Sequence, residues 1–145
     1  MLKFLGGLLM PFEYPYTLRL ADTDAAGVVY FAEVLRICHE AYEEALLALG
    51  CDWRQMLQQS ELVLPVVHSS ADLLAPMFCG DRLLIILTPK RLRASEFSVR
   101  YHLFAQDNRD RLLARARTRH VCIQRASRQR CDLPGAIAQW VDGSA

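Results

Sequence analysis

The longest regular pattern in the chain is FAEVLRICHEAYEEALLAL, residues 31–49. Its apolar residues recur at spacings of three and four, which places them on one face of an α-helix, while charged residues fill the opposite face. Gly50 follows, where a glycine commonly ends a helix. The pattern predicts an amphipathic helix that must bury one face, formed by Val34, Leu35, Cys38, Ala41, Tyr42, Ala45, Leu46 and Leu49.

Much of the remaining chain alternates between apolar and polar residues with the period of two that is typical of β-strands. Between Phe97 and Leu103, for example, every second residue is apolar. We expect strands at residues 15–21, 63–74, 82–92, 95–105 and 112–124, and short helices at 53–59 and 133–141. One long helix must cover one face of an antiparallel sheet. The expected fold is therefore α+β, with a sheet of about five strands, the last four in a meander, packed on one long helix.

Length and composition place these elements in a single domain. The chain has 145 residues, 52% of them hydrophobic, which suits one domain with one core. We expect residues 1–11 to be an N-terminal extension and residues 12–145 to be the domain. The apolar run in the extension is short and no cleavage site follows it, which disfavours a secretion signal. No stretch approaches the roughly 18 apolar residues of a membrane span.

Cysteine number and charge restrict the compartment and the partner. Five cysteines without a C-x-x-C pair argue against a disulfide framework or a zinc site, and indicate a cytoplasmic protein. Residues 82–131 hold thirteen basic and three acidic side chains, yet the net charge of the whole chain is only +1. This disfavours nucleic acid as a partner. A small polyphosphate ligand needs only a few arginines.

The segment before the long helix carries the motif Asp22-Thr23-Asp24-Ala25-Ala26-Gly27-Val28-Val29-Tyr30-Phe31. It resembles the D-x-D-x-x-G-x-V-[YW]-[FYH] signature of the 4-hydroxybenzoyl-CoA thioesterase family, which has the hotdog fold. Pro76-x-x-x-Gly80-Asp81 resembles the turn before the third strand of that family. The resemblance covers residues 12–125. It implies a hotdog acyl-CoA thioesterase, with coenzyme A as part of the substrate and no separate cofactor.

Within this family the likeness is closest to the 1,4-dihydroxy-2-naphthoyl-CoA hydrolases of phylloquinone synthesis. It rests on segments that the fold alone does not require, such as residues 38–43, 64–68 and 112–116. Hydrolysis of an aromatic acyl-CoA is therefore the first hypothesis. The alternatives are a thioesterase for 4-hydroxybenzoyl-CoA or fatty acyl-CoA, and a non-catalytic acyl-CoA binding protein. Phe31 stands where other branches often carry histidine, which counts against short acyl chains.

The resemblance assigns the catalytic acid to Asp24. The loop would deliver this carboxylate near the helix N-terminus, where unpaired N–H groups of about Tyr30 and Phe31 can polarise a thioester carbonyl and hold the oxyanion. Asp24 then attacks the carbonyl directly or activates a water molecule. Gly27 permits close backbone approach, and Asp22 is expected to be structural. The alternatives are a loop in which an aspartate only caps the helix, and a metal-binding D-x-D pair.

Several other residues are weaker candidates. Arg93 is the first choice for binding the CoA phosphates, and His68 is expected to line the substrate site. His68, Ser70 and Asp72 share one strand face, so they point the same way in parallel and do not form a catalytic relay. Two further histidines, His102 and His120, are expected at the surface or in an interface. An arginine set is predicted to bind phosphate, face solvent or pair between subunits; it comprises Arg91, Arg93, Arg100, Arg115, Arg117 and Arg119.

Self-association is a separate expectation. Domains of the resembled family pair their sheets and build their active sites between subunits. The resemblance therefore implies a homodimer or homotetramer that binds a small-molecule acyl-CoA.

Overall fold

A computed structural model describes residues 4–5, 8–9 and 11–143 of the chain. The long helix α1 spans Phe31–Ala48, with Leu49 as its C-terminal cap and Gly50 at φ +86° immediately beyond. Only glycine adopts this left-handed conformation without strain. The predicted helix of residues 31–49 is confirmed to within one residue. Most of its apolar face is buried, while Leu35 and Leu49 are partly exposed.

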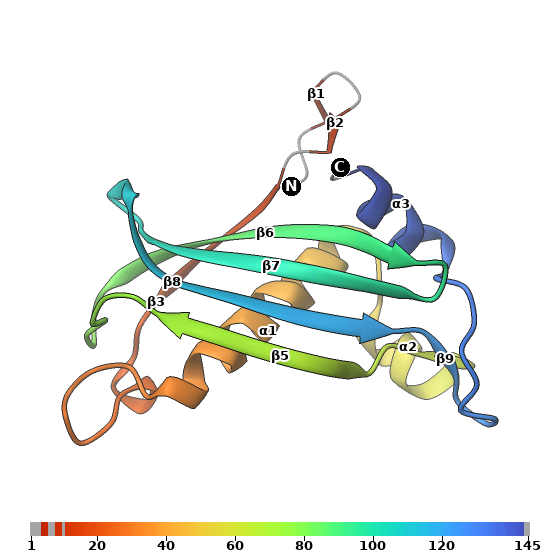
Figure 1. Ribbon diagram of the computed structural model, residues 1–145, viewed down its shortest axis with the longest axis horizontal. Helices are drawn as coiled ribbons and strands as arrows, with labels where there is room; N and C mark the ends of the chain where they lie inside the picture. Colours follow the sequence, from red (N-terminus) through yellow and green to blue (C-terminus); the bar gives the residue numbers. More distant parts are fainter. Residues whose placement is uncertain (1–3, 6–7, 10, 144–145) are drawn as a thin grey trace.

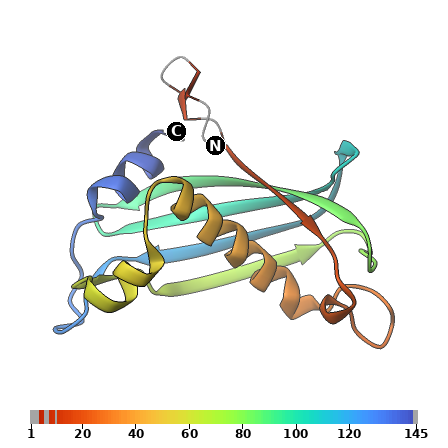
Figure 2. The same ribbon diagram turned by 180° about the vertical axis from the view of Figure 1, so that it is seen from behind.

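The main sheet has five antiparallel strands in the order β3-β6-β7-β8-β5 (Figure 1). Figure 2 shows α1 lying diagonally across one face of this sheet, as predicted for an α+β fold. The strands are β3 (Phe12–Thr17), β5 (Val66–Leu73), β6 (Arg82–Arg93), β7 (Glu96–Ala105) and β8 (Asn108–Val121).

The expected four-strand meander is wrong, because β5 does not pair with β6. Instead β5 pairs with β8 at the far edge of the sheet, and only β6, β7 and β8 follow one another as neighbours. The chain between β5 and β6 runs past the start of α1. There the Val29 amide donates to the Met77 carbonyl at 2.8 Å, and the Gly80 amide donates to Leu18 at 2.8 Å. This connection lets the sheet curl around the helix with β3 and β5 as its two edges.

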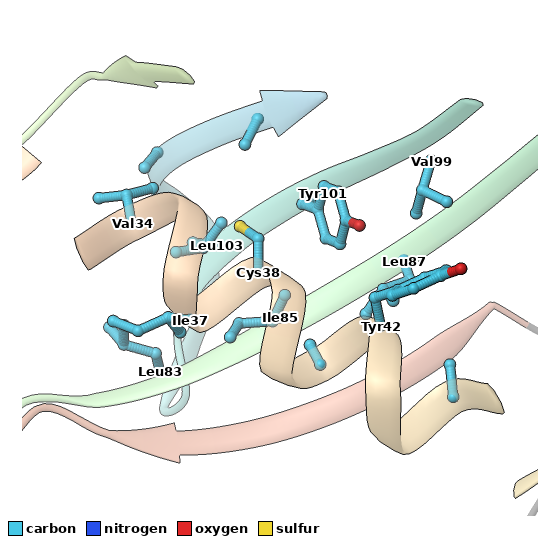
Figure 3. Close-up of a cluster of buried hydrophobic side chains, with 14 of the residues drawn as sticks. Val34, Ile37, Cys38, Tyr42, Leu83, Ile85, Leu87, Val99, Tyr101 and Leu103 are labelled. Carbon is cyan, nitrogen blue, oxygen red and sulfur yellow. The ribbon is translucent and has the colours of Figure 1, made fainter. Parts of the chain in front are cut away.

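The core lies between α1 and the inner face of the sheet (Figure 3). Tyr42 and Cys38 project from the helix onto the central strands, and Ile85 lies beneath them with no solvent exposure. The four apolar residues that were predicted to share one face of residues 95–105 are all buried: Phe97, Val99, Tyr101 and Leu103. The opposite face is exposed only in part, since Glu96 and Ser98 are buried as well.

The first strand and the short elements differ from expectation mainly in their bounds. β3 begins at Phe12 and ends at Thr17, and a 3-10 turn, η1 (Leu20–Asp22), follows where the strand was expected to continue. The remaining elements are β1 (Phe4–Leu5), β2 (Leu8–Leu9), α2 (Trp53–Gln59), β4 (Leu62–Val63), β9 (Ile123–Gln124) and α3 (Gly135–Gly143). The proposed extension, residues 1–11, lies partly outside the described residues.

Among the residues that the structure describes, no helix is both long enough and apolar enough to cross a membrane.

Candidate active site

The loop between η1 and α1 is anchored by Asp22, which is 3% exposed. Its carboxylate accepts hydrogen bonds from the Tyr16 hydroxyl at 2.9 Å and the Arg19 amide at 2.8 Å, and forms an ion pair with Arg36 at 2.5 Å. Burial alone would raise the pKa of Asp22, but the donors from Arg19, Tyr16 and Arg36 lower it below its usual value. Asp22 is therefore a structural anchor, as the sequence indicated.

Asp24 lies exposed two residues further along. Its Oδ1 accepts a hydrogen bond from the Ala26 amide at 2.8 Å, while its backbone amide donates to the Val28 carbonyl at 2.9 Å. Gly27 closes the turn with φ +80°, a conformation that L side chains rarely adopt. The loop thus fixes the carboxylate through one oxygen and leaves Oδ2 without a hydrogen bond from the part of the chain described.

The N-terminus of α1 supplies amide donors beside this loop. The Tyr30 amide donates to the Asp22 carbonyl at 2.8 Å, so this group is already used within the chain. Phe31 and Ala32 are the first two residues of the helix, and their amides make no backbone hydrogen bond within the described ranges. The geometry therefore points to Phe31 and Ala32, rather than Tyr30 and Phe31, as the pair that can stabilise an oxyanion.

An apolar cavity of about 260 Å³ lies against the same loop. Two large side chains that follow its lining residues in sequence are exposed, Phe31 at 65% and Phe78 at 49%. The isolated bridge between Val28 and Phe78 joins the cavity wall to the Asp24 loop. The cavity is lined by Val28, Val29, Leu73, Leu74, Ala75, Pro76 and Met77. Such a surface suits a flat apolar group held near the carboxylate.

A larger polar cavity of about 570 Å³ lies at the other end of the β5–β6 connection. Arg82 and Arg111 line it, and neither guanidinium forms an ion pair with another described residue. Neither arginine was predicted as a site residue from the sequence. The signal was present, because Arg82 directly follows the Gly80-Asp81 turn of the family motif.

His68 and Arg93 do not lie beside Asp24 in the same chain. Figure 1 shows the loop before α1 at one end of the sheet, and α2, α3 and the β6–β7 turn at the other. Arg93 ends β6 at that turn. His68 stands near the start of β5, and the five residues to Leu73 at the loop end span roughly 16 Å. The predicted site residues are thus split between the two ends of the domain.

The arginine set is partly neutralised within the chain. Arg115 pairs with Asp72 at 2.8 Å across β5 and β8, and Arg119 pairs with Glu96 at 2.9 Å. Arg91 binds Asp142 in α3 through two hydrogen bonds. These three arginines are therefore tied to carboxylates, while Arg93, Arg100 and Arg117 form no ion pair with the residues described.

The expectation that His120 lies at the surface or in an interface is wrong. Its ring has no solvent exposure and stacks between Phe97 at 4.8 Å and Tyr42 at 4.6 Å. Nε2 lies 2.9 Å from the Thr118 hydroxyl, which also contacts the Tyr101 hydroxyl at 3.0 Å. Burial lowers the pKa of His120 to about 4, so the ring is neutral near pH 7.

A metal site of the D-x-D type finds no support in the geometry. The Asp22 carboxylate is occupied by Tyr16, Arg19 and Arg36, and Asp24 faces solvent. In the ranges that the structure describes, no group of three or more His, Cys, Asp or Glu side chains is arranged to hold a metal ion.

Comparison with known proteins places this site in a family. Residues 18–141 match the model of the thioesterase-like superfamily. A 1,4-dihydroxy-2-naphthoyl-CoA hydrolase of Crocosphaera subtropica is 47% identical over 128 residues, which cover 88% of this chain and 93% of the relative. The enzyme of the same name from Rippkaea orientalis is 46% identical over 129 residues, covering 89% and 94% of the two chains.

Solved structures agree with these relatives. The crystal structure of a 1,4-dihydroxy-2-naphthoyl-CoA thioesterase from Synechocystis superposes with a TM-score of 0.86 at 40% identity, covering 91% of this chain and 96% of that one. A putative thioesterase from Prochlorococcus marinus superposes with a TM-score of 0.84 at 33% identity, covering 92% and 96%. These findings confirm the predicted family and fold. The chain belongs to the thioesterase-like superfamily and is a hotdog thioesterase.

Proposed function

We propose that this chain hydrolyses 1,4-dihydroxy-2-naphthoyl-CoA to 1,4-dihydroxy-2-naphthoate and CoA, a step of phylloquinone synthesis. Relatives of that name share 46–47% of its residues over nearly their whole length. The observation that carries the proposal is the placement of Asp24 in the loop that leads into α1, whose first two amides make no backbone hydrogen bond to the residues described. The adjoining apolar cavity supports an aromatic acyl group.

The chemistry follows from the loop. The free Oδ2 of Asp24 attacks the thioester carbonyl, and the Phe31 and Ala32 amides stabilise the oxyanion as the thiolate leaves. Water then cleaves the resulting anhydride and restores the carboxylate. In the second route Asp24 takes a proton from the attacking water instead. Both routes need only the carboxylate and water, so we propose that the enzyme requires no cofactor beyond the CoA of its substrate.

Substrate binding is proposed to use both cavities. The naphthoyl ring occupies the apolar cavity beside Val28, and the CoA phosphates bind Arg82 and Arg111, which form no ion pair with described residues. The β5–β6 connection contributes residues to the linings of both cavities. Arg93 remains a candidate for phosphate binding only if a second chain brings it close to the loop.

A homodimer or homotetramer would supply that second chain. β5 is an edge strand whose Val67 is 46% exposed and whose Leu73 is 44% exposed. Such an edge pairs readily with another strand. If two β5 strands pair antiparallel, the start of one lies beside the end of the other, and His68 of the second copy approaches the Asp24 loop of the first. Light scattering of wild type and of Val67→Asp tests this arrangement, and a monomeric wild type would contradict it.

A cytoplasmic location is also proposed. All five cysteines are free thiols in the structure, which suits a reducing compartment.

A thiol-release assay tests the function with naphthoyl, 4-hydroxybenzoyl and fatty acyl thioesters of CoA. We expect the naphthoyl substrate to give the highest kcat/KM, and Asp24→Asn to lower kcat at least about 100-fold. Asp110→Asn is the matched control, because Asp110 is exposed on β8 outside the proposed active site. Full activity of Asp24→Asn would refute the mechanism. Faster cleavage of a fatty acyl thioester would refute the substrate, and tight binding without cleavage would favour a non-catalytic role.

A further inference from the structure

Two of the five cysteines face each other at the base of a hairpin. The sulfur atoms of Cys122 and Cys131 lie 3.5 Å apart, and the Cys131 amide donates to the Cys122 carbonyl at 3.0 Å. An isolated antiparallel bridge between Ile123 and Arg130 follows directly. The two thiols are therefore held together by backbone pairing and not only by side-chain packing.

The two thiols differ in accessibility. Cys122 has no solvent exposure, whereas Cys131 is partly exposed. Burial, followed by the hydrogen bond with Cys131, raises the pKa of Cys122 to about 12. A dissolved reagent therefore reacts with Cys131 first. The buried Cys122 thiol reacts afterwards, with the Cys131 sulfur that lies beside it.

We propose that Cys122 and Cys131 form a reversible thiol–disulfide exchange site for low-molecular-mass disulfides of the glutathione type. The Cys131 thiolate attacks one sulfur of the small disulfide, forms a mixed disulfide and releases one thiolate, which takes up the Cys131 proton. Cys122 then loses its proton and attacks the Cys131 sulfur, which forms the intrachain disulfide. The second small thiolate leaves and takes up the Cys122 proton. One small disulfide is reduced to two thiols, and the two cysteines are oxidised to one cystine.

The disulfide would restrain a hairpin that contacts β4 and the end of α2. β9 lies in this hairpin and pairs with β4. Arg125 follows β9, and its guanidinium donates to the Ser60 carbonyl at 3.1 Å and to the Leu57 carbonyl at 3.2 Å at the end of α2. Oxidation therefore fixes the segment that holds α2 against the domain.

Stabilisation by the bond follows from the short ring it closes. The cysteines are nine positions apart. The loop entropy lost by the unfolded chain for a ring of about ten residues corresponds to a roughly hundredfold smaller unfolding constant. The oxidised protein should therefore resist urea more strongly than the reduced protein, and a reductant should reverse the difference.

The test uses the purified full chain, incubated with oxidised glutathione, alkylated and mapped by mass spectrometry. We expect an intrachain link between Cys122 and Cys131, lost in Cys131→Ser. Cys122→Ala should instead accumulate a lasting glutathione adduct on Cys131, because the second step cannot occur. The matched control is Cys79→Ser, which removes an exposed thiol elsewhere and should leave the link intact.

Two results would overturn the proposal. One is a wild-type protein in which Cys131 keeps its glutathione adduct or remains fully alkylated under oxidising conditions. The other is an equal urea midpoint for oxidised and reduced wild type despite the link, which would remove the stabilising role. If Cys122→Ala fails to fold, Cys131→Ser decides alone, since Cys131 is partly exposed and its replacement is conservative.

Discussion

Acid should weaken the fold through His120, and the variant His120→Gln should relieve much of that loss. The neutral ring is buried between Phe97 and Tyr42, which lowers its pKa to about 4, against 6.5 for the free side chain. Below pH 6.5 the unfolded chain binds a proton at this position, whereas the ring in the folded chain stays neutral until the pH approaches 4. The stability is therefore fully present above pH 6.5 and is lost progressively as the pH falls toward 4.

The size of the effect follows from these two pKa values. The difference between the pKa of 6.5 in the unfolded chain and about 4 in the folded chain corresponds to about 3 kcal/mol of folding stability, of which about 2 kcal/mol is already lost at pH 5. Glutamine keeps a polar group near the Thr118 hydroxyl but takes up no proton. Between pH 7.5 and pH 5, wild type should therefore lose about 2 kcal/mol more free energy of unfolding than His120→Gln does.

Urea unfolding at both pH values gives the loss in free energy of unfolding for wild type and for His120→Gln. The titration of the carboxylates contributes equally to both losses and cancels when they are subtracted. His68→Gln is the matched control, because it makes the same replacement at an exposed position on β5. Equal acid losses in wild type and His120→Gln would refute the reasoning, because the buried ring would then have no lowered pKa.

Three further substitutions test the loop and the core. Gly27→Ala should destabilise the protein by about 1 kcal/mol and lower kcat, because alanine is strained at φ +80°; urea unfolding and the thiol-release assay report both effects. Arg36→Met leaves the buried Asp22 carboxylate without its cation and should cost about 1–3 kcal/mol, and an unchanged urea midpoint would contradict this. Ile85→Ala empties a fully buried position and should cost about 2–5 kcal/mol. Ile86→Ala on the other face is its control and should cost clearly less.

Local periodicity was sufficient to predict most helices and strands. The α1 and α2 bounds agree with the sequence reading to within one residue, because an amphipathic helix and its cap are specified by residues close in sequence. The strand alternation of β7 is equally local. The 3-10 turn at Leu20–Asp22 was missed; its Asp22 carboxylate is also held by Arg36 of α1, a contact that strand periodicity does not indicate.

Strand order was not predictable in the same way. Whether β5 pairs with β6 or with β8 depends on contacts between residues far apart in the sequence, and both pairings are compatible with alternating side chains. A meander is the shortest connection, so it is the natural expectation. The hydrogen bonds of the β5–β6 connection to Val29 and Leu18 favour the longer path instead, because they tie it beneath the start of α1.

The burial of His120 was predictable from the alternation of side chains along β8. Period two places Arg115, Arg117 and Arg119 on one face of β8, and the same rule places His120 with Ala114 and Ala116 on the other. That other face is the one that packs on α1. The polarity of histidine alone favours a surface position for His120, whereas the alternation of side chains in the strand places it on the buried face.

The two aspartates of the loop differ in their surroundings, and Arg36 accounts for the difference. The helix pattern places Arg36 on the solvent face, and the side chain is indeed 46% exposed. Its guanidinium nevertheless reaches back over the helix start to Asp22, and it also contacts Glu33 and the Tyr16 hydroxyl. Asp22 is therefore held by side chains from both flanking elements, whereas the described residues that hold Asp24 all belong to its own turn. In the proposed mechanism Asp24 attacks the thioester or activates water, and the buried Asp22 anchors the loop that presents it.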